Sequence, residues 1–273
     1  MLVKEVKQWE PQNSTLNVLL WGKEGVGKTY LTATMPKPCM YLTFDPNALN
    51  GVNDQIVSGA IKAEDIPYLS FDDGDYREVA MAYKDPTNPF GLESIYKETP
   101  FKTLVLDSLT SWFKLALTYA IELSRTYGLK EQPTIERPQL VGYGIRSTAT
   151  KEMAFNLINW CRKHGVNCVF IAHKGEMVKD EQTGIMYNSI GLSGDIPNEI
   201  ARWCDECWMM GVDGTGKRLL QVQPLSNARP LKTRMFSSDV STVDATTLSL
   251  SQLIDAWRST GKINNDTLTH LKG

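Results

Sequence analysis

The stretch that decides the fold is LNVLLWGKEGVGKTYLTATM, residues 16–35. It begins with a short apolar run typical of a buried strand, continues as a glycine-rich loop over 22–29, and ends as a helix that Pro36 and Pro38 close. The loop has the pattern G-x-x-x-x-G-K-[ST], in which glycines let backbone N–H groups converge on phosphates beside a helix N-terminus. Because the flanking strand and helix are the context that this motif requires, the sequence predicts a nucleotide site rather than a fortuitous glycine loop.

Two side chains of the loop, those of Lys28 and Thr29, are expected to contact the nucleotide and its metal ion. Lys28 is expected to reach the β- and γ-phosphates of ATP, and the Thr29 hydroxyl is expected to bind Mg²⁺, so ATP and Mg²⁺ are the predicted cofactors. The predicted nucleotide-binding residues are Gly22, Lys23, Glu24, Gly25, Val26, Gly27, Lys28 and Thr29.

Two further carboxylates follow apolar runs and are candidates for the chemistry. Asp107 comes after the run 103–106 and is expected to hold the metal together with Thr29, with a helix N-cap as the alternative. Asp45 ends the run 40–44 and is the candidate general base, although Pro46 makes an ordinary turn residue the alternative. Asp72 and Asp73 are second candidates for the base, in a cluster that also suits a solvated acidic surface.

The remaining pattern predicts an α/β fold. We expect a mostly parallel central sheet flanked by helices, a C-terminal antiparallel hairpin and one domain, 1–273, with a core of about 16–236 and a helical tail of about 245–273. The interval 50–100 is expected to form helices joined by a surface loop. The other expected strands are 103–106, 166–172, 206–211 and 218–222, and the other expected helices are 111–127, 148–164, 197–203 and 248–259.

Composition limits the setting and the partners. The chain has 273 residues and a formal net charge of −2, which excludes a protein that coats nucleic acid by overall charge. Five cysteines, an odd number, indicate a reducing compartment, and the lone pair Cys204 and Cys207 is expected to pack in the core. No apolar run approaches the ~20 residues needed to span a bilayer, so a cytoplasmic protein without membrane contact is expected.

Taken together, these motifs resemble the RecA/RadA recombinase core over about 16–236. The resemblance rests on the phosphate loop, on Leu-Val-Leu-Asp-Ser at 104–108, on the helix 146–164 and on the strand 169–173. It implies that His173 senses the γ-phosphate. A histidine there, in place of the usual Asn or Gln, resembles small phage-encoded RecA-like ATPases linked to single-strand annealing and recombination, and implies a phage-infected bacterial cell.

A basic element near the end of the core resembles one that RadA-type relatives point into a neighbouring subunit's ATP. It is Leu-Lys-Thr-Arg at 231–234, and the resemblance implies that Lys232 and Arg234 act on the neighbour's nucleotide, so that hydrolysis depends on assembly. A solvated basic strand end is the alternative. Two departures from that family are expected: the N-terminal domain of full recombinases is missing, and Asp45, Pro46 and Asn47 stand where their Glu follows the second strand.

The same resemblance implies two DNA-contacting loops, 128–144 and 174–193. Both loops also contain acids, so ordinary surface loops are the alternative. The segment 214–238, with five Lys and Arg and no Asp or Glu, is a further basic candidate. The candidate DNA-binding residues in the two loops are Lys130, Arg137, Tyr143, Lys174 and Lys179.

The leading functional expectation is an ATPase that assembles on single-stranded DNA in recombination or strand annealing. Its expected partners are single-stranded DNA, further copies of itself in a ring or filament, and a single-stranded-DNA-binding protein. The alternative is a nucleotide-gated interaction protein, such as a helicase loader or a regulatory switch. A small-molecule kinase comes third, because it needs an arginine-bearing lid and 128–146 is a poor one.

Overall fold

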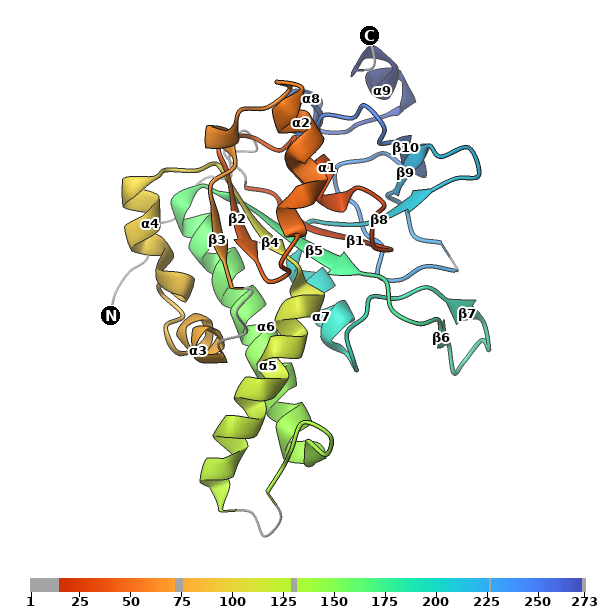
Figure 1. Cartoon of the computed structure of the whole chain (residues 1–273). Coiled ribbons are helices and arrows are strands. Elements are labelled where there is room, and N and C mark those ends of the chain that lie inside the picture. The colour runs from red at the N-terminus through yellow and green to blue at the C-terminus, as the bar shows by residue number, and fades with distance from the viewer. Residues whose placement is uncertain (1–14, 72–75, 129–131, 226, 272–273) are drawn as a thin grey trace, which may run out of the picture.

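The computed structural model describes residues 15–71, 76–128, 132–225 and 227–271, and in these residues one large sheet organises the molecule (Figure 1). Neighbouring strands are parallel from β3 across to β8, and β9 and β10 then continue the sheet in antiparallel pairing. The strand order confirms the predicted mostly parallel sheet with a C-terminal antiparallel hairpin. In spatial order the strands are β3 (Tyr68–Ser70), β2 (Cys39–Thr43), β4 (Thr103–Asp107), β5 (Asn167–His173), β1 (Asn17–Gly22), β8 (Glu206–Val212), β9 (Arg218–Gln221) and β10 (Thr242–Asp244).

Alternation along the strands divides the interior into two cores. In β1, Leu19 and Trp21 belong to one core, whereas Val18 and Leu20 belong to the other. Both faces are apolar because a parallel strand covered on both sides has no solvent face. The first core is covered by α3 (Tyr76–Lys84), α4 (Leu92–Glu98), α5 (Leu109–Ser124), α6 (Gln139–His164) and α7 (Ile196–Trp203), and the second by α1 (Lys28–Thr32), α2 (Asn53–Val57), α8 (Leu250–Thr260) and α9 (Asn265–Leu271).

The structure corrects three local expectations. The interval 50–100 contributes the edge strand β3, and β10 extends the sheet at its other edge. Helix α6 begins at Gln139, so the loop expected over 128–144 is shorter, because packing against α5 outweighs the helix-breaking tendency of Gly142 and Gly144. The polar loop after β5 contains a two-stranded hairpin, formed by β6 (Val178–Lys179) and β7 (Met186–Tyr187). Short 3₁₀ turns are η2 (Ala48–Val52), η3 (Ala63–Asp65), η4 (Pro89–Gly91) and η5 (Arg125–Tyr127).

Helices α5 and α6 extend together beyond the sheet as a helical arm, at the bottom of Figure 1. The β6–β7 hairpin projects from a different side of the molecule, next to β5 and the segment that follows β9. All five cysteines are free and buried, as expected for core residues. Within the described residues, no helix combines the length and the apolar character that crossing a membrane requires.

Candidate active site

The phosphate loop lies at the carboxyl edge of the parallel strands, directly after β1. Gly22 ends this strand so close to β8 that a Cβ there would lie 2.2 Å from the Met210 carbonyl oxygen, which only glycine avoids. Gly27 has φ = 97°, a left-handed conformation that favours glycine, and it turns the chain into α1. A pocket of about 590 Å³ is lined by the loop residues Glu24, Gly25, Gly27, Lys28 and Thr29, together with Asp45, Asp107 and His173.

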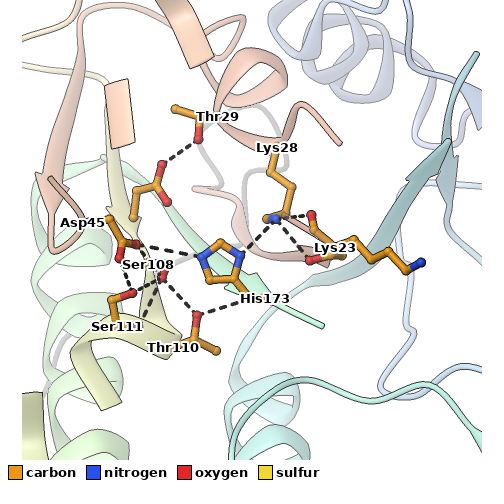
Figure 2. A network of polar contacts seen from close by, with 10 residues as sticks. Lys23, Lys28, Thr29, Asp45, Ser108, Thr110, Ser111 and His173 are labelled. Carbon is orange, nitrogen blue, oxygen red and sulfur yellow. Dashed lines mark hydrogen bonds and ion pairs between the residues drawn. The ribbon is translucent and has the colours of Figure 1, made fainter. Parts of the chain in front are cut away.

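Lys28 is buried at the base of this pocket. Its Nζ donates hydrogen bonds to the carbonyl oxygens of Gly22 at 3.1 Å and Lys23 at 2.7 Å, and lies 3.3 Å from Nδ1 of His173. Burial lowers the pKa of Lys28 to about 8, opposed most strongly by the charge of Asp107. The side chain of Lys23 points away from this group of polar contacts (Figure 2). Lys28 is thus a buried cation that an anionic ligand would stabilise.

Thr29 and Asp107 are positioned by strands that are not neighbours. Thr29 lies in α1, which follows β1, and Asp107 ends β4, with β5 between β1 and β4. The Thr29 hydroxyl donates a 2.7 Å hydrogen bond to Oδ2 of Asp107. Burial raises the pKa of Asp107 to about 6, and the bond from Thr29 opposes this increase. A hydroxyl and a buried carboxylate beside a buried lysine form a donor set that fits a magnesium–nucleotide complex. Thr29 and Asp107 would hold Mg²⁺, which would neutralise charge on the phosphates.

Asp45 is held by hydroxyl groups at the start of α5. It accepts hydrogen bonds from the hydroxyls of Ser111 at 2.7 Å and Ser108 at 3.1 Å, and its Oδ2 lies 3.9 Å from Nε2 of His173 (Figure 2). Burial acts to raise the pKa of Asp45, but the nearby His173 and the hydrogen bonds from Ser111 and Ser108 outweigh it and lower the pKa. Asp45 is therefore ionised and oriented, and not a freely turning loop residue.

His173 links the phosphate loop to Asp45. One ring nitrogen faces Lys28 and the other faces Asp45, and the backbone N–H of His173 donates to the Thr110 hydroxyl at 3.2 Å. The structure therefore brings together the predicted residues Lys28, Thr29, Asp45, Asp107 and His173. Sequence reasoning missed the hydroxyl groups of Ser108, Thr110 and Ser111, although a hydroxyl-rich helix start directly after Asp107 was a usable signal.

Lys232 and Arg234 lie at the opposite, amino edge of the parallel strands. Lys232 donates to three carbonyl oxygens around the end of α7, the shortest at 2.6 Å from Cys204. Arg234 is exposed and pairs with Asp205 at 3.1 Å. The two side chains therefore do not join the pocket of their own chain, which agrees with a role on another copy or with a structural role.

The candidate DNA-binding residues divide between two places. Lys174 directly follows β5, and Lys179 lies on the exposed β6–β7 hairpin. Arg137 is exposed in the turn just before α6, and Tyr143 is exposed on α6, where its ring lies 5.1 Å from the Arg146 guanidinium. Lys130 lies outside the described residues, as do Asp72 and Asp73, the second candidates for the base.

A phosphate loop with a buried lysine, a hydroxyl and a buried carboxylate, set at the carboxyl edge of a mostly parallel sheet, defines a P-loop nucleotide-binding protein. A family model described as an AAA domain matches residues 14–234. The chain therefore belongs to this AAA-domain family, and it is a P-loop ATPase. The family implies that it binds a nucleotide together with Mg²⁺.

Among solved structures, the chain is similar to a KaiC-like protein from the hyperthermophilic archaeon Pyrococcus horikoshii. The identity is 16%, the match covers 80% of this chain and 82% of that chain, and the TM-score is 0.38. No curated protein matches the sequence.

Proposed function

We propose that this ATPase hydrolyses ATP with Asp45 as the base and His173 as the link to the γ-phosphate, and that it does so as an assembly on single-stranded DNA. The observation that carries the first part is the polar chain Lys28–His173–Asp45. Lys28 lies beside His173 in the pocket, where it would bind the terminal phosphates, and Asp45 is held by two serine hydroxyls. Such a carboxylate accepts a proton from a water molecule that attacks the γ-phosphate.

The proposed coupling to DNA starts from the position of His173 at the end of β5. The backbone N–H of Lys174 donates to the Gly22 carbonyl at 2.9 Å, and that of Gly191 donates to the His173 carbonyl at 2.9 Å. Both ends of the segment that contains the β6–β7 hairpin are thereby bonded to the site. A shift of His173 toward bound phosphate would move this hairpin, which carries Lys179.

Fluorescence anisotropy with labelled single-stranded DNA tests this coupling. The double variant Lys174→Ala/Lys179→Ala is expected to lose most ATP-dependent binding and to show a shallower salt dependence, because each lysine that neutralises a phosphate adds to the salt slope. The control, Lys97→Ala/Lys163→Ala, removes two exposed lysines from α4 and α6. Equal binding by the two variants would place the DNA contact elsewhere, and an absence of ATP-dependent binding by the wild type would refute the DNA function.

A second candidate function is a nucleotide-gated protein switch, such as a helicase loader. The β6–β7 hairpin favours it, because four apolar side chains, Met177, Val178, Ile185 and Met186, are 42–49% exposed there. Apolar groups gathered on a projecting hairpin are typical of a protein contact. If the double variant Met177→Ser/Met186→Ser loses partner binding but retains DNA-independent ATP hydrolysis, the switch is favoured over the recombination protein.

Assembly is proposed to supply Arg234 to a neighbouring copy's site. Its side chain is 64% exposed and its pair with Asp205 lies at the surface, where such pairs contribute little, so it can move to another anion. Lys232 is instead proposed to anchor the same segment. The specific ATPase rate of the wild type is expected to rise with protein concentration, and that of Arg234→Ala to stay low and flat. A wild-type rate independent of concentration would refute the contribution from a neighbour.

A further inference from the structure

A cation that the sequence pattern did not single out lies against the phosphate loop. Arg218, at the start of β9, places its guanidinium 4.6 Å from the centre of the Tyr30 ring. It also packs on Gly27, where an added Cβ would lie 2.8 Å from the guanidinium Nε. Arg218 and Tyr30 line the same pocket as Lys28.

Arg218 differs from Lys217, Arg229 and Arg234 of this basic segment in having no acidic partner among the described residues. Lys217 pairs with Asp244 at 3.0 Å, and Arg229 pairs with Asp180 at 2.7 Å. Within the described part of the chain, no carboxylate lies within 4.0 Å of the Arg218 guanidinium. A stacked guanidinium of this kind keeps a face and several N–H groups for a ligand.

The strand order puts Arg218 and Tyr30 at one end of the pocket. Strands β5 and β4, which end in His173 and Asp107, and β2, which Asp45 follows, lie on one side of β1, whereas β8 and β9 lie on the other. A triphosphate across the loop with its terminal phosphate beside His173 therefore has its nucleoside at the end where Arg218 and Tyr30 lie. Tyr30 directly follows Thr29, at the first turn of α1.

We propose that Arg218 and Tyr30 form the nucleoside-binding end of the site and stack with the base of a purine nucleoside triphosphate. The proposal rests on the nucleotide orientation of the proposed function. Stacking tolerates different bases because every base has a π-face, so ATP and GTP bind with similar affinity. Purines bind more tightly than pyrimidines because they offer a larger surface to the stacked pair.

Competition binding with ATP, GTP, CTP and inorganic triphosphate tests the assignment, because inorganic triphosphate lacks the base. For Arg218→Ala and for Tyr30→Ala, the affinity for ATP and GTP is expected to fall about tenfold, while that for inorganic triphosphate is unchanged. Tyr30→Phe retains the ring and is expected to bind like the wild type. Lys217→Ala is the matched control, one residue away on the same hairpin.

The outcomes separate this proposal from the proposed function. Equal loss of affinity for ATP and for inorganic triphosphate would show that Arg218 contacts phosphates, and would overturn the stacking role. Unchanged ATP affinity would also overturn it. If Arg218→Ala fails to fold, Arg218→Lys keeps the charge but not the planar stack and is expected to lose the same base contribution. Failure of the wild type to bind either ATP or inorganic triphosphate would instead refute the nucleotide site itself.

Discussion

The two edges of the parallel sheet compensate their buried charges in different ways. At the carboxyl edge, one hydroxyl donates to Asp107, and Lys28 has two carbonyl partners in its own loop. At the amino edge, Lys232 has three carbonyl partners, and Glu206 accepts two backbone N–H groups and the Trp208 indole N–H, each within 2.8 Å. Burial raises the pKa of both carboxyls, to about 6 and about 7.

The difference shows where the chain leaves room for a ligand. The amino edge uses the buried Glu206 and the half-buried Lys232 to connect β8 to the segment that carries Arg234, so their partners lie within the fold. The carboxyl edge leaves a buried lysine and a buried carboxylate facing a pocket, and a nucleotide with a metal ion would complete their partners. Substitutions at the carboxyl edge should therefore affect activity, and those at the amino edge should affect stability.

The largest expected effect is that of Lys28→Ala. Removing the cation that is proposed to bind the terminal phosphates is expected to lower kcat/KM for ATP by about 10³-fold. The free energy of unfolding without nucleotide is expected to change little or to rise, since a buried charge is lost. Steady-state ATPase assays and urea unfolding measure the two quantities. A large fall in the free energy of unfolding of Lys28→Ala, alongside the fall in kcat/KM, would contradict the distinction between the two edges.

Asp45→Asn should separate chemistry from binding at the carboxyl edge. The amide keeps the size of the side chain but cannot take a proton, so kcat is expected to fall about 10²-fold with ATP affinity nearly unchanged. Single-turnover hydrolysis and equilibrium ATP binding provide the test. Ser111→Ala, which removes one orienting hydroxyl, is expected to lie between this variant and the wild type. A normal kcat for Asp45→Asn would exclude this carboxylate as the base.

At the amino edge, Lys232→Ala is expected to reduce stability. It removes the ammonium from three carbonyl oxygens near the end of α7 and should cost about 2 kcal/mol of unfolding free energy. Urea unfolding measures this loss, and the ATPase rate per folded molecule at low protein concentration is expected to stay close to that of the wild type. Lys262→Ala, which removes a lysine bonded to one carbonyl of the same segment, is the milder control.

Glu206 provides the pH test of the same edge. Burial raises its folded-state pKa to about 7, above the ordinary 4.5 of the unfolded chain, so its contribution to stability is complete below about pH 4.5 and is lost as pH rises through 7. Between pH 5 and pH 8 the wild type is expected to lose roughly 2 kcal/mol more unfolding free energy than Glu206→Gln, which cannot ionise. Urea unfolding across this range measures both proteins, and parallel profiles would contradict the expectation.

The phosphate loop and the carboxyl ends of β2, β4 and β5 were predictable from sequence because their signals are local. A glycine pattern between an apolar run and a helix identifies the loop, and the carboxyl ends of parallel strands gather at one edge, which brings Asp45, Asp107 and His173 near Lys28. The helix start at Gln139 was not predictable in this way. Gly142 and Gly144 indicate a loop locally, and only packing against α5 makes them helical.

The sequence by itself determined the nucleotide loop, the α/β class and the polar residues at the strand ends, since each depends on short-range pattern and periodicity. The tertiary structure decided that β5 separates β1 from β4, which puts His173 between Lys28 and Asp45, and that β9 returns Arg218 to the loop. It also placed Lys232 and Arg234 at the opposite edge. The physical reason is that strand order and register follow from burying two apolar faces at once, which no short stretch of sequence encodes.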